Sequence, residues 1–240
     1  MRATWIIAKK ELKGYFDSLI AYVMIILFLG FSGFFTWLYG SDIFLVGQAS
    51  LRTFFSIAYW TLFFFIPALT MKSIAEEKRS GAIELLLTKP VTDWQLITGK
   101  FLANLLIIVI ALLLTVVYVI TLSNIGNIDL GAIFLGYFGL VLMSATYIAI
   151  GIFTSSLTNN QIVAFLFALL IGLFFHIIFG ALASASTGWL GGLFSYLNLN
   201  THFESISRGV LDTKDLIYFL SIMFVGLYLS VINLAKRNLN

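Results

Sequence analysis

The sequence contains no cysteine, only two histidines and only two prolines, and charged residues make up 10% of its 240 residues. Without cysteine there is no disulfide framework, no thiolate metal site and no cysteine nucleophile. Soluble domains are about a quarter charged, whereas 60% of this chain is hydrophobic and its mean hydropathy is +1.02. The composition is typical of an integral membrane protein, and a net charge of +3 does not indicate nucleic-acid binding.

Several catalytic motifs are also absent. No G-x-x-x-x-G-K-[ST] sequence occurs, so the chain has no phosphate-binding loop for ATP. Gly99-Lys100 has no upstream glycine at the needed spacing and no serine or threonine after it. No H-E-x-x-H or G-x-S-x-G sequence occurs, which argues against zinc and serine peptidases. We expect a non-catalytic chain with no metal or cofactor of its own.

Six segments are long and apolar enough to cross a bilayer, which requires about 20 residues each. They lie at about residues 18–39, 51–71, 101–123, 132–156, 160–182 and 215–235. Pro67 lies inside the second segment and predicts a kink there. The fold class is therefore all-α integral membrane, with six transmembrane helices in a single domain over residues 1–240.

Few ionisable residues fall within these spans. Proton and sodium relays usually need buried carboxylates, so the absence of buried carboxylates from the spans argues against a secondary transporter or an ion pump. His176 lies in the fifth span. It is open to two interpretations, a neutral histidine hydrogen-bonded to a neighbouring helix or a substrate contact.

Basic residues gather in three parts of the sequence. Eleven of the fourteen lysines and arginines lie before the first span, between residues 72 and 100, or at the C-terminus. The other three are Arg52, Arg208 and Lys214. The positive-inside rule therefore predicts that both termini and the 72–100 segment are cytoplasmic, which an even number of spans permits.

Residues 1–17 predict an amphipathic helix. At 100° per residue, an apolar arc lies beside a basic arc that includes Lys9 and Lys13. The apolar arc consists of Trp5, Ala8, Leu12, Tyr15 and Phe16. Such a helix lies in the interface of the bilayer, on the anionic inner leaflet, although a simple topology anchor explains the same residues.

The segment 76–100, EEKRSGAIELLLTKPVTDWQLITGK, holds four basic and four acidic residues between two apolar spans. Ser80 can cap a short helix over residues 81–88, which Pro90 ends. Thr92 and Gln95 have the spacing of a capping box at the start of the next helix. The first helix carries Leu85, Leu86 and Leu87 rimmed by charge, which is typical of a docking surface for a soluble protein, unless the leucines lie in the membrane interface.

Three segments in this order resemble ABC-2-type permeases: ELLLTKP within the charged loop, SSLTNNQIVAF at 155–165, and HFESISRGVLDTKDLIYFLS from residue 202 onward. Within that family they are most similar to the gliding-motility-associated ABC permeases of Bacteroidetes. The resemblance implies a multi-pass protein of the bacterial inner membrane. It also implies that the short loop helix is a coupling helix that sits in a groove of a separate ATPase.

The resemblance further implies partners and contact residues. Two copies of a cytoplasmic ABC ATPase would bind ATP and Mg. A second permease fold would be either another copy or a companion membrane subunit with a large extracytoplasmic domain, meeting this one through spans one and five. The implied ATPase contacts are Glu76, Glu77, Gly81, Glu84, Leu85, Leu86, Leu87 and Pro90.

Residues 183–214 are too rich in glycine, serine and asparagine to span a bilayer. The resemblance implies a pair of short re-entrant helices on the extracytoplasmic side, whereas a plain helical loop on spans five and six is the alternative. Phe203, Ile206 and Val210 are spaced as an apolar stripe, and Glu204, Arg208 and Asp212 as an i, i+4 row. Phe203, Glu204, Arg208 and Asp212 are therefore candidate gate or partner contacts.

Two functions remain open from the sequence. The chain is either the permease of an ATP-driven exporter or a mechanotransmission subunit that drives an extracytoplasmic partner without transport. A copper-enzyme maturation exporter is a further alternative within the first function. The sequence names no substrate.

Overall fold

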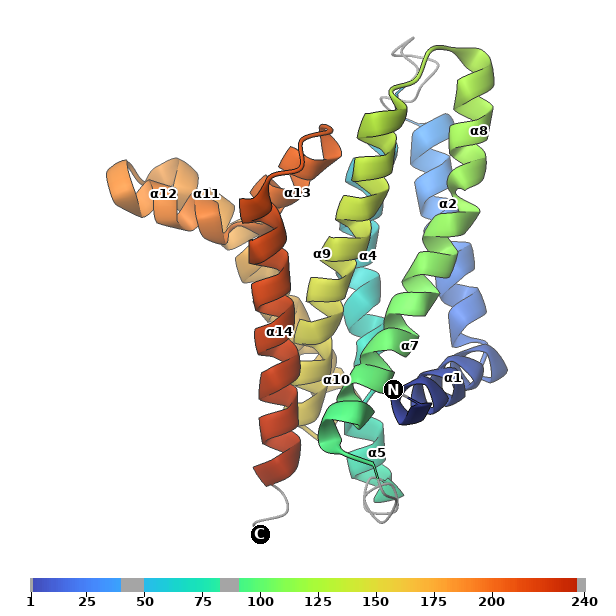
Figure 1. Ribbon diagram of the computed structural model, residues 1–240, viewed down its shortest axis with the longest axis vertical. Coiled ribbons are helices and arrows are strands. Elements are labelled where there is room, and N and C mark those ends of the chain that lie inside the picture. The colour runs from blue at the N-terminus through green and yellow to red at the C-terminus, as the bar shows by residue number, and fades with distance from the viewer. Residues whose placement is uncertain (1, 40–49, 83–90, 237–240) are drawn as a thin grey trace.

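The computed structural model describes residues 2–39, 50–82 and 91–236 (Figure 1). All regular elements in these ranges are helical, which confirms the all-α prediction. A short amphipathic helix, α1 (Arg2–Asp17), precedes the spans, as residues 1–17 predicted.

Six helical segments of the described chain are long and apolar enough to cross a membrane. They are α2 (Ile20–Trp37), α4 (Arg52–Thr70) with α5 (Ala75–Ser80), α7 (Asp93–Leu114) with α8 (Val116–Ile125), α9 (Leu130–Leu157), α10 (Gln161–Leu173) with the π-helical turn η1 (Phe174–Ile178) and α11 (Phe179–Ala185), and α14 (Thr213–Ala235). All six predicted spans are confirmed. The Thr92–Gln95 capping box at the start of α7 is also confirmed.

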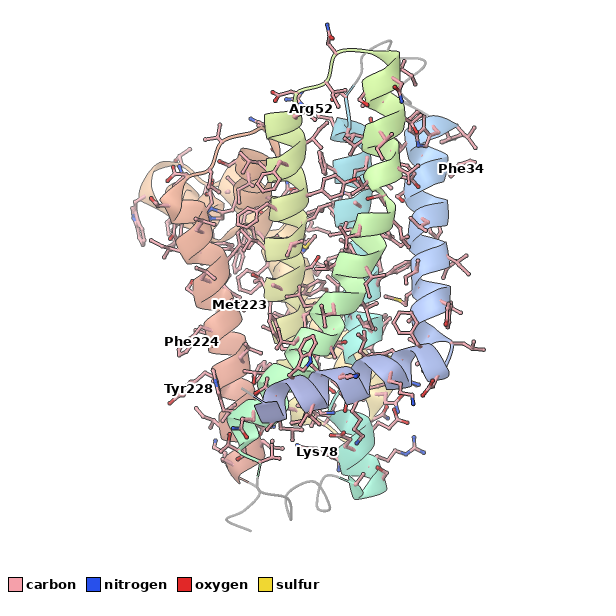
Figure 2. The ribbon with its side chains drawn as sticks, turned by 45° about the vertical axis from the view of Figure 1, so that its right-hand side comes forward. Phe34, Arg52, Lys78, Met223, Phe224 and Tyr228 are labelled. Carbon is pink, nitrogen blue, oxygen red and sulfur yellow. The ribbon has the colours of Figure 1, made fainter. Side chains whose placement is uncertain are left out.

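The basic segments gather at one end of the bundle. Helix α1 lies across this end, where α5 and the C-terminal end of α14 are also found (Figures 1 and 2). We call it the basic end. Two short helices, α12 (Gly188–Leu197) and α13 (Leu199–Ser207), lie toward the opposite end, where Arg52 begins α4. The predicted pair of short helices between spans five and six is therefore present.

Helix α9 is the centre of the bundle. It is the most buried of the six spans and packs against α4, α7, α10, α13 and α14. A hydrogen bond from the Thr146 hydroxyl to the Phe219 carbonyl, 3.1 Å, joins α9 to α14. Hydroxyl-to-carbonyl bonds between helices are common in membranes, where the apolar surroundings offer these groups no other partner.

Helix α4 runs on past Pro67 and ends at Thr70, and the chain then turns over residues 71–74 before α5 begins. The break therefore follows Pro67 by several residues. Ser80 is the last residue of α5, and its hydroxyl donates to the Glu77 carbonyl at 3.4 Å. The helix that Ser80 is predicted to cap, over residues 81–88, lies almost wholly outside the described residues, so its capping stays a prediction.

The predicted stripes around α13 are correct only up to the end of that helix. Phe203 and Ile206 are 3% and 0% exposed, but Val210 is 58% exposed. Arg208 and Glu204 form the expected i, i+4 ion pair at 2.9 Å, whereas Asp212 caps α14 and pairs with Lys214. The reason is Gly209, whose φ of +92° turns the chain out of the helical path.

Candidate coupling site at the basic end

The break between α4 and α5 is held by a serine of α9. The Ser155 hydroxyl accepts hydrogen bonds from the Ile74 and Ala75 backbone N–H groups, at 3.0 and 3.1 Å, and donates to the Met71 carbonyl at 3.0 Å. Ser155 is fully buried. Helix α5 has no side-chain N-cap of its own. The Ser155 side chain of α9 satisfies its first backbone N–H groups instead, as an N-cap residue would.

The next residue of α9 joins two further helices. The Ser156 carbonyl, near the C-terminal end of α9, accepts hydrogen bonds from the Lys78 ammonium group of α5 and the Asn233 amide of α14. A cation at this position also complements the negative end of the helix dipole. Helices α5, α9 and α14 therefore meet at the same carbonyl group.

Lys100 connects α7 to α5 and to α1. Its ammonium nitrogen lies 2.7 Å from Glu77 Oε1 and 3.1 Å from Glu11 Oε1. The Lys100 side chain is 2% exposed, whereas the two glutamates are 17% and 21% exposed. The two carboxylates offset the lost hydration of the buried ammonium group, and the two ion pairs join three helices.

Gly99, the residue before Lys100, allows α1 to approach α7. A Cβ atom at position 99 would lie 2.7 Å from Ile7 Cγ2 and 3.0 Å from the Thr4 carbonyl oxygen of α1. Any side chain here would push the two helices apart. Gly99 and Lys100 therefore have a packing role. Gly99 leaves room for α1, and Lys100 forms an ion pair with Glu11 of α1.

A polar layer lies beneath α1. The Tyr15 hydroxyl donates to Asn104 Oδ1 at 3.0 Å, and the Asn104 amide donates to Ser73 Oγ at 3.3 Å. Burial raises the pKa of Tyr15, so its hydroxyl stays neutral and remains a donor. Tyr15 and Ser73 line a cavity of about 320 Å³, together with Lys10, Lys72 and Glu76.

The structure brings together only part of the predicted ATPase contact. Glu77 is partly buried against Lys100, while Glu76 is exposed. Gly81 is exposed and ends α5 in the left-handed conformation, φ +70°, which favours glycine. Glu84, Leu85, Leu86, Leu87 and Pro90 lie outside the described residues.

The predicted membrane contacts of α1 point outward. Trp5 is 58% exposed, and Lys9 and Lys13 are exposed as well. Ala8 and Tyr15, from the same predicted apolar arc, are buried against the bundle instead. Helix α1 therefore presents one part of that arc to the protein and leaves Trp5 available to the bilayer.

A hollow of about 660 Å³ lies beside α5. Arg79 lines one side, and Leu157 and the connection from α9 to α10, residues 158–160, line the other. The Asn160 side chain caps α10 by accepting from the Ile162 N–H at 2.9 Å. This polar connection and α5 therefore form a continuous surface at the basic end.

Sequence reasoning missed Glu11, Ser155 and Ser156 as parts of this site. Ser155 and Ser156 belong to a segment that resembled the family, but their spacing carries no sign of what they bind. Glu11 is not among the residues that the sequence analysis selects. Its separation of 89 positions from Lys100 means that only the packing of α1 on α7 reveals the pair.

The opposite end contains a buried ionisable pair that the sequence argument excluded. His202 Nδ1 lies 2.6 Å from Asp215 Oδ1, and His202 Nε2 lies 2.8 Å from the Tyr196 carbonyl oxygen. Asp215 is 1% exposed. The inference that the spans lack buried carboxylates is wrong here, because the first turn of α14 carries Asp215 into contact with α13.

His176 lies in the π-helical turn of the fifth span. Its Nδ1 is 3.0 Å from the Gly172 carbonyl oxygen of the same segment, so the predicted bond to a neighbouring helix is wrong. The ring is surrounded by Tyr59, Phe63 and Tyr147, with centroids 4.7 to 5.3 Å away. Within the described residues, Nε2 is buried without a hydrogen-bond partner.

Comparison with known proteins places these features in a family. The family model described as "ABC-2 family transporter protein" matches residues 5–232. Over 152 residues the chain is 29% identical to the "Probable multidrug ABC transporter permease YbhR" of Escherichia coli strain K12, and equally to the protein of that name from strain O157:H7. The alignment covers 60% of this chain and 39% of each relative, so the chain spans well under half of their length.

Proposed function

The chain belongs to the ABC-2 family of transporter proteins, and from this premise we propose that it couples ATP hydrolysis by a separate ATPase to movement of its membrane helices. The ATPase would bind at the basic end, on the cytoplasmic side of the inner membrane. ATP and Mg would be bound by that partner chain, in two copies, because this sequence contains no phosphate-binding loop.

The observation that carries the proposal is the Glu11–Lys100–Glu77 ion-pair cluster. The segment between α5 and α7 contains the three consecutive leucines, and its two flanking helices are joined to each other by Glu77 and Lys100. A push on that segment would therefore reach α4 through α5, α7 directly, and α1 through Glu11. A loop with unconnected ends would absorb the same displacement.

The surface beside α5 supports a docking role as well. The hollow between Arg79 and residues 158–160 adds polar groups beside α5, the helix that precedes the leucine-containing segment in the sequence. Soluble partners commonly bind an apolar anchor surrounded by a polar rim. We therefore include the α9–α10 connection in the proposed ATPase contact, together with Glu76, Gly81, Glu84 and Pro90.

The output of the coupling is proposed to be export, with mechanotransmission to an extracytoplasmic partner as the alternative. The finer assignment to the gliding-motility permease GldF rests on the resemblance of the three quoted segments. The name of the Escherichia coli relative would instead suggest multidrug export. Export for copper-enzyme maturation is the remaining possibility.

The test is the substitution Leu86→Asp. A carboxylate desolvated at a docking surface without a partner costs about 3 kcal/mol or more, and each 1.4 kcal/mol is about tenfold in affinity. We therefore expect co-purification of the ATPase from membranes to fall by about a hundredfold, while the variant chain still inserts. The isolated parent chain should show no ATP turnover.

The matched control is Lys89→Ala, a charge on the rim of the same segment that should change ATPase recovery little. If Leu86→Asp retains the ATPase as well as the parent chain does, the leucines belong to the membrane interface and the docking assignment is wrong. ATP turnover by the purified chain would also contradict the proposal that a separate ATPase chain hydrolyses the ATP.

A further inference from the structure

Helix α1 is joined to the first membrane span by a tight corner. Two residues, Ser18 and Leu19, connect the end of α1 to the start of α2. Leu19 has a φ of +63°, in the left-handed region that residues other than glycine rarely adopt. The Ser18 hydroxyl donates to the Tyr15 carbonyl at 3.2 Å. Because α2 is long and apolar enough to cross a membrane, this corner places α1 at the membrane surface.

The two sides of α1 have different surroundings. Glu11 and Tyr15 face the bundle, where Glu11 lies 3.1 Å from the Lys100 ammonium nitrogen and the Tyr15 ring is buried. With 3.6 residues per turn, Lys9 and Lys13 each lie about 160° around the helix from Glu11. Both lysines are exposed. Helix α1 therefore directs its paired carboxylate into the protein and these two lysines away from it.

The lysine face, which consists of Lys9 and Lys13, carries uncompensated positive charge. Neither lysine has a carboxylate within ion-pair distance in the part of the chain that the structure describes. Asp17 is exposed about one turn after Lys13 but does not pair with it. Trp5, about one turn before Lys9, is 58% exposed. The face thus presents two ammonium groups, on residues about 6 Å apart along the helix, next to an indole ring.

The lysine face lies apart from the surface that is expected to meet a second permease fold. That surface is on α2 and α10, and α10 packs against α4 and α9. Helix α1 packs against α7 and lies in front of it in Figure 2. Lys13 and Lys9 are about 6 and 12 Å along α1 from its end at Asp17, where the chain turns into α2. The membrane surface is therefore available to both lysines.

An anionic phospholipid is the ligand whose chemistry fits this face. Lysine ammonium groups bind phosphate as point charges, and basic residues at a membrane surface attract anionic lipids. Indole rings lie at the level of the headgroups, with one apolar side and one polar side. A phosphate on the two lysines, with the start of an acyl chain against Trp5, would occupy both parts of the face.

We propose that an anionic phospholipid of the cytoplasmic leaflet binds along Lys9 and Lys13 and, by holding α1 in place, regulates the coupling between the ATPase and the spans. The lipid site stands on the contacts above, whereas its regulatory role rests on the proposed function. Glu11 is the link, because its pair with Lys100 joins α1 to α7 and, through Glu77, to α5. An α1 that is held by lipid resists displacement, so more of a push on the segment between α5 and α7 reaches the spans.

The first test uses the full chain without its ATPase, in an uncharged detergent, titrated with dioctanoyl phosphatidylglycerol and followed by native mass spectrometry. Each lysine near an anionic lipid surface accounts for about fivefold in affinity. Lys9→Gln should therefore weaken lipid binding about fivefold, and Lys9→Gln combined with Lys13→Gln about thirtyfold. Displacement of the lipid by inorganic phosphate at the same concentration would overturn the lipid assignment in favour of a free anion.

The matched control is Lys10→Gln, the same change of charge on the neighbouring residue. Lys10 is also exposed, but it lines the cavity that Glu11, Glu76 and Glu77 share. It lies about 100° around the helix from Lys9. This variant should bind the lipid within about twofold of the parent. Equal losses in Lys9→Gln and Lys10→Gln would overturn the site in favour of a general charge effect.

The second test measures ATP turnover by the complex with its ATPase, in bilayers of phosphatidylcholine with and without phosphatidylglycerol. Turnover by the parent complex should depend on the anionic lipid, and the double variant Lys9→Gln with Lys13→Gln should lose this dependence. Glu11→Gln should bind the lipid as the parent does and still lose the dependence, because a neutral amide cannot replace the ion pair with Lys100.

The outcomes separate the regulation from the proposed function on which it rests. Equal turnover in both bilayers, from a parent complex that retains its ATPase, would overturn the regulatory role of the lipid. A parent chain that recovers no ATPase from membranes would instead contradict the proposed function itself.

Discussion

Lys100 shows how a single residue can organise one end of a membrane protein. A lysine that is 2% exposed loses most of its hydration, and the loss is offset by two carboxylates at 2.7 and 3.1 Å. Glu77 Oε2 has no hydrogen-bond partner within the described segments, so the Lys100 charge is the main compensation for that buried carboxylate. The three charges form a unit in which each depends on the other two.

Removing the central charge should destabilise the basic end. Lys100→Met keeps the length of the side chain but leaves Glu11 and Glu77 unpaired. Loss of one partner of a buried ion pair costs about 3–5 kcal/mol, and the partial exposure of both glutamates places the effect near the lower value. Thermal unfolding in detergent should show a lower transition temperature.

The control for this substitution is Lys9→Met, which removes an exposed charge from α1 and should leave the transition unchanged. The double variant Lys100→Met with Glu77→Gln should recover part of the loss, because it removes one stranded carboxylate. If Lys100→Met unfolds at the parent temperature, the cluster does not hold α1, α5 and α7 together.

At the scale of elements, the break between α4 and α5 is the joint through which the coupling segment reaches the spans. A helix break inside a membrane protein leaves backbone groups that must find partners. Ser155 supplies an acceptor for two N–H groups and a donor for one carbonyl. The α4–α5 corner is therefore attached to α9, the most buried span.

Ser155→Ala should loosen this corner. The substitution leaves two buried N–H groups without their acceptor, at a cost of about 1–3 kcal/mol for each unsatisfied group. If α5 passes motion from the ATPase to α4, the variant should still co-purify with the ATPase but show weaker coupling of ATP turnover to output. The measurement is ATPase recovery and turnover of the complex in parallel.

Ser221→Ala is the control, since among the described residues the Ser221 hydroxyl bonds only within its own helix, to the Tyr218 carbonyl at 2.8 Å. Both measurements should match the parent for this variant. Unchanged coupling in Ser155→Ala would assign the serine to folding alone and would remove α5 from the proposed path.

At the scale of the whole molecule, burial is unevenly shared among the spans. Helix α2 and the α10–α11 segment are the least buried. In each of them 22% of the residues in an 18-residue apolar stretch are buried, against 67% in α9. Helix α4 packs against both α2 and α10 and so lies between them. The less buried spans are the two that the sequence analysis expects at the contact with a second permease fold.

Cysteine cross-linking can test this contact, because the parent chain contains no cysteine. A single cysteine at Leu166 or Leu170, which are 54% and 57% exposed on α10, should cross-link to a second copy or to a companion subunit. Ala168, 1% exposed on the opposite face, is the matched control and should not react. Absence of cross-links from every exposed position of α2 and α10 would contradict the interface.

Local patterns in the sequence were sufficient for much of the fold. Hydropathy located all six spans, helical periodicity located α1, and the Thr92–Gln95 spacing located the start of α7. These features depend on residues within about one or two helical turns of each other, so they can be read before any tertiary contact is known. The family resemblance likewise rested on contiguous segments, and the family match agrees with it.

Tertiary structure decided what those elements do to one another. The Glu11–Lys100 and Ser155–Ile74 contacts join positions 89 and 81 residues apart, and no local spacing specifies such pairs. The same holds for His202 and Asp215, since only the turn at Gly209 brings α13 back onto α14. Burial of a charge is a property of packing, because the partners that stabilise it come from different helices.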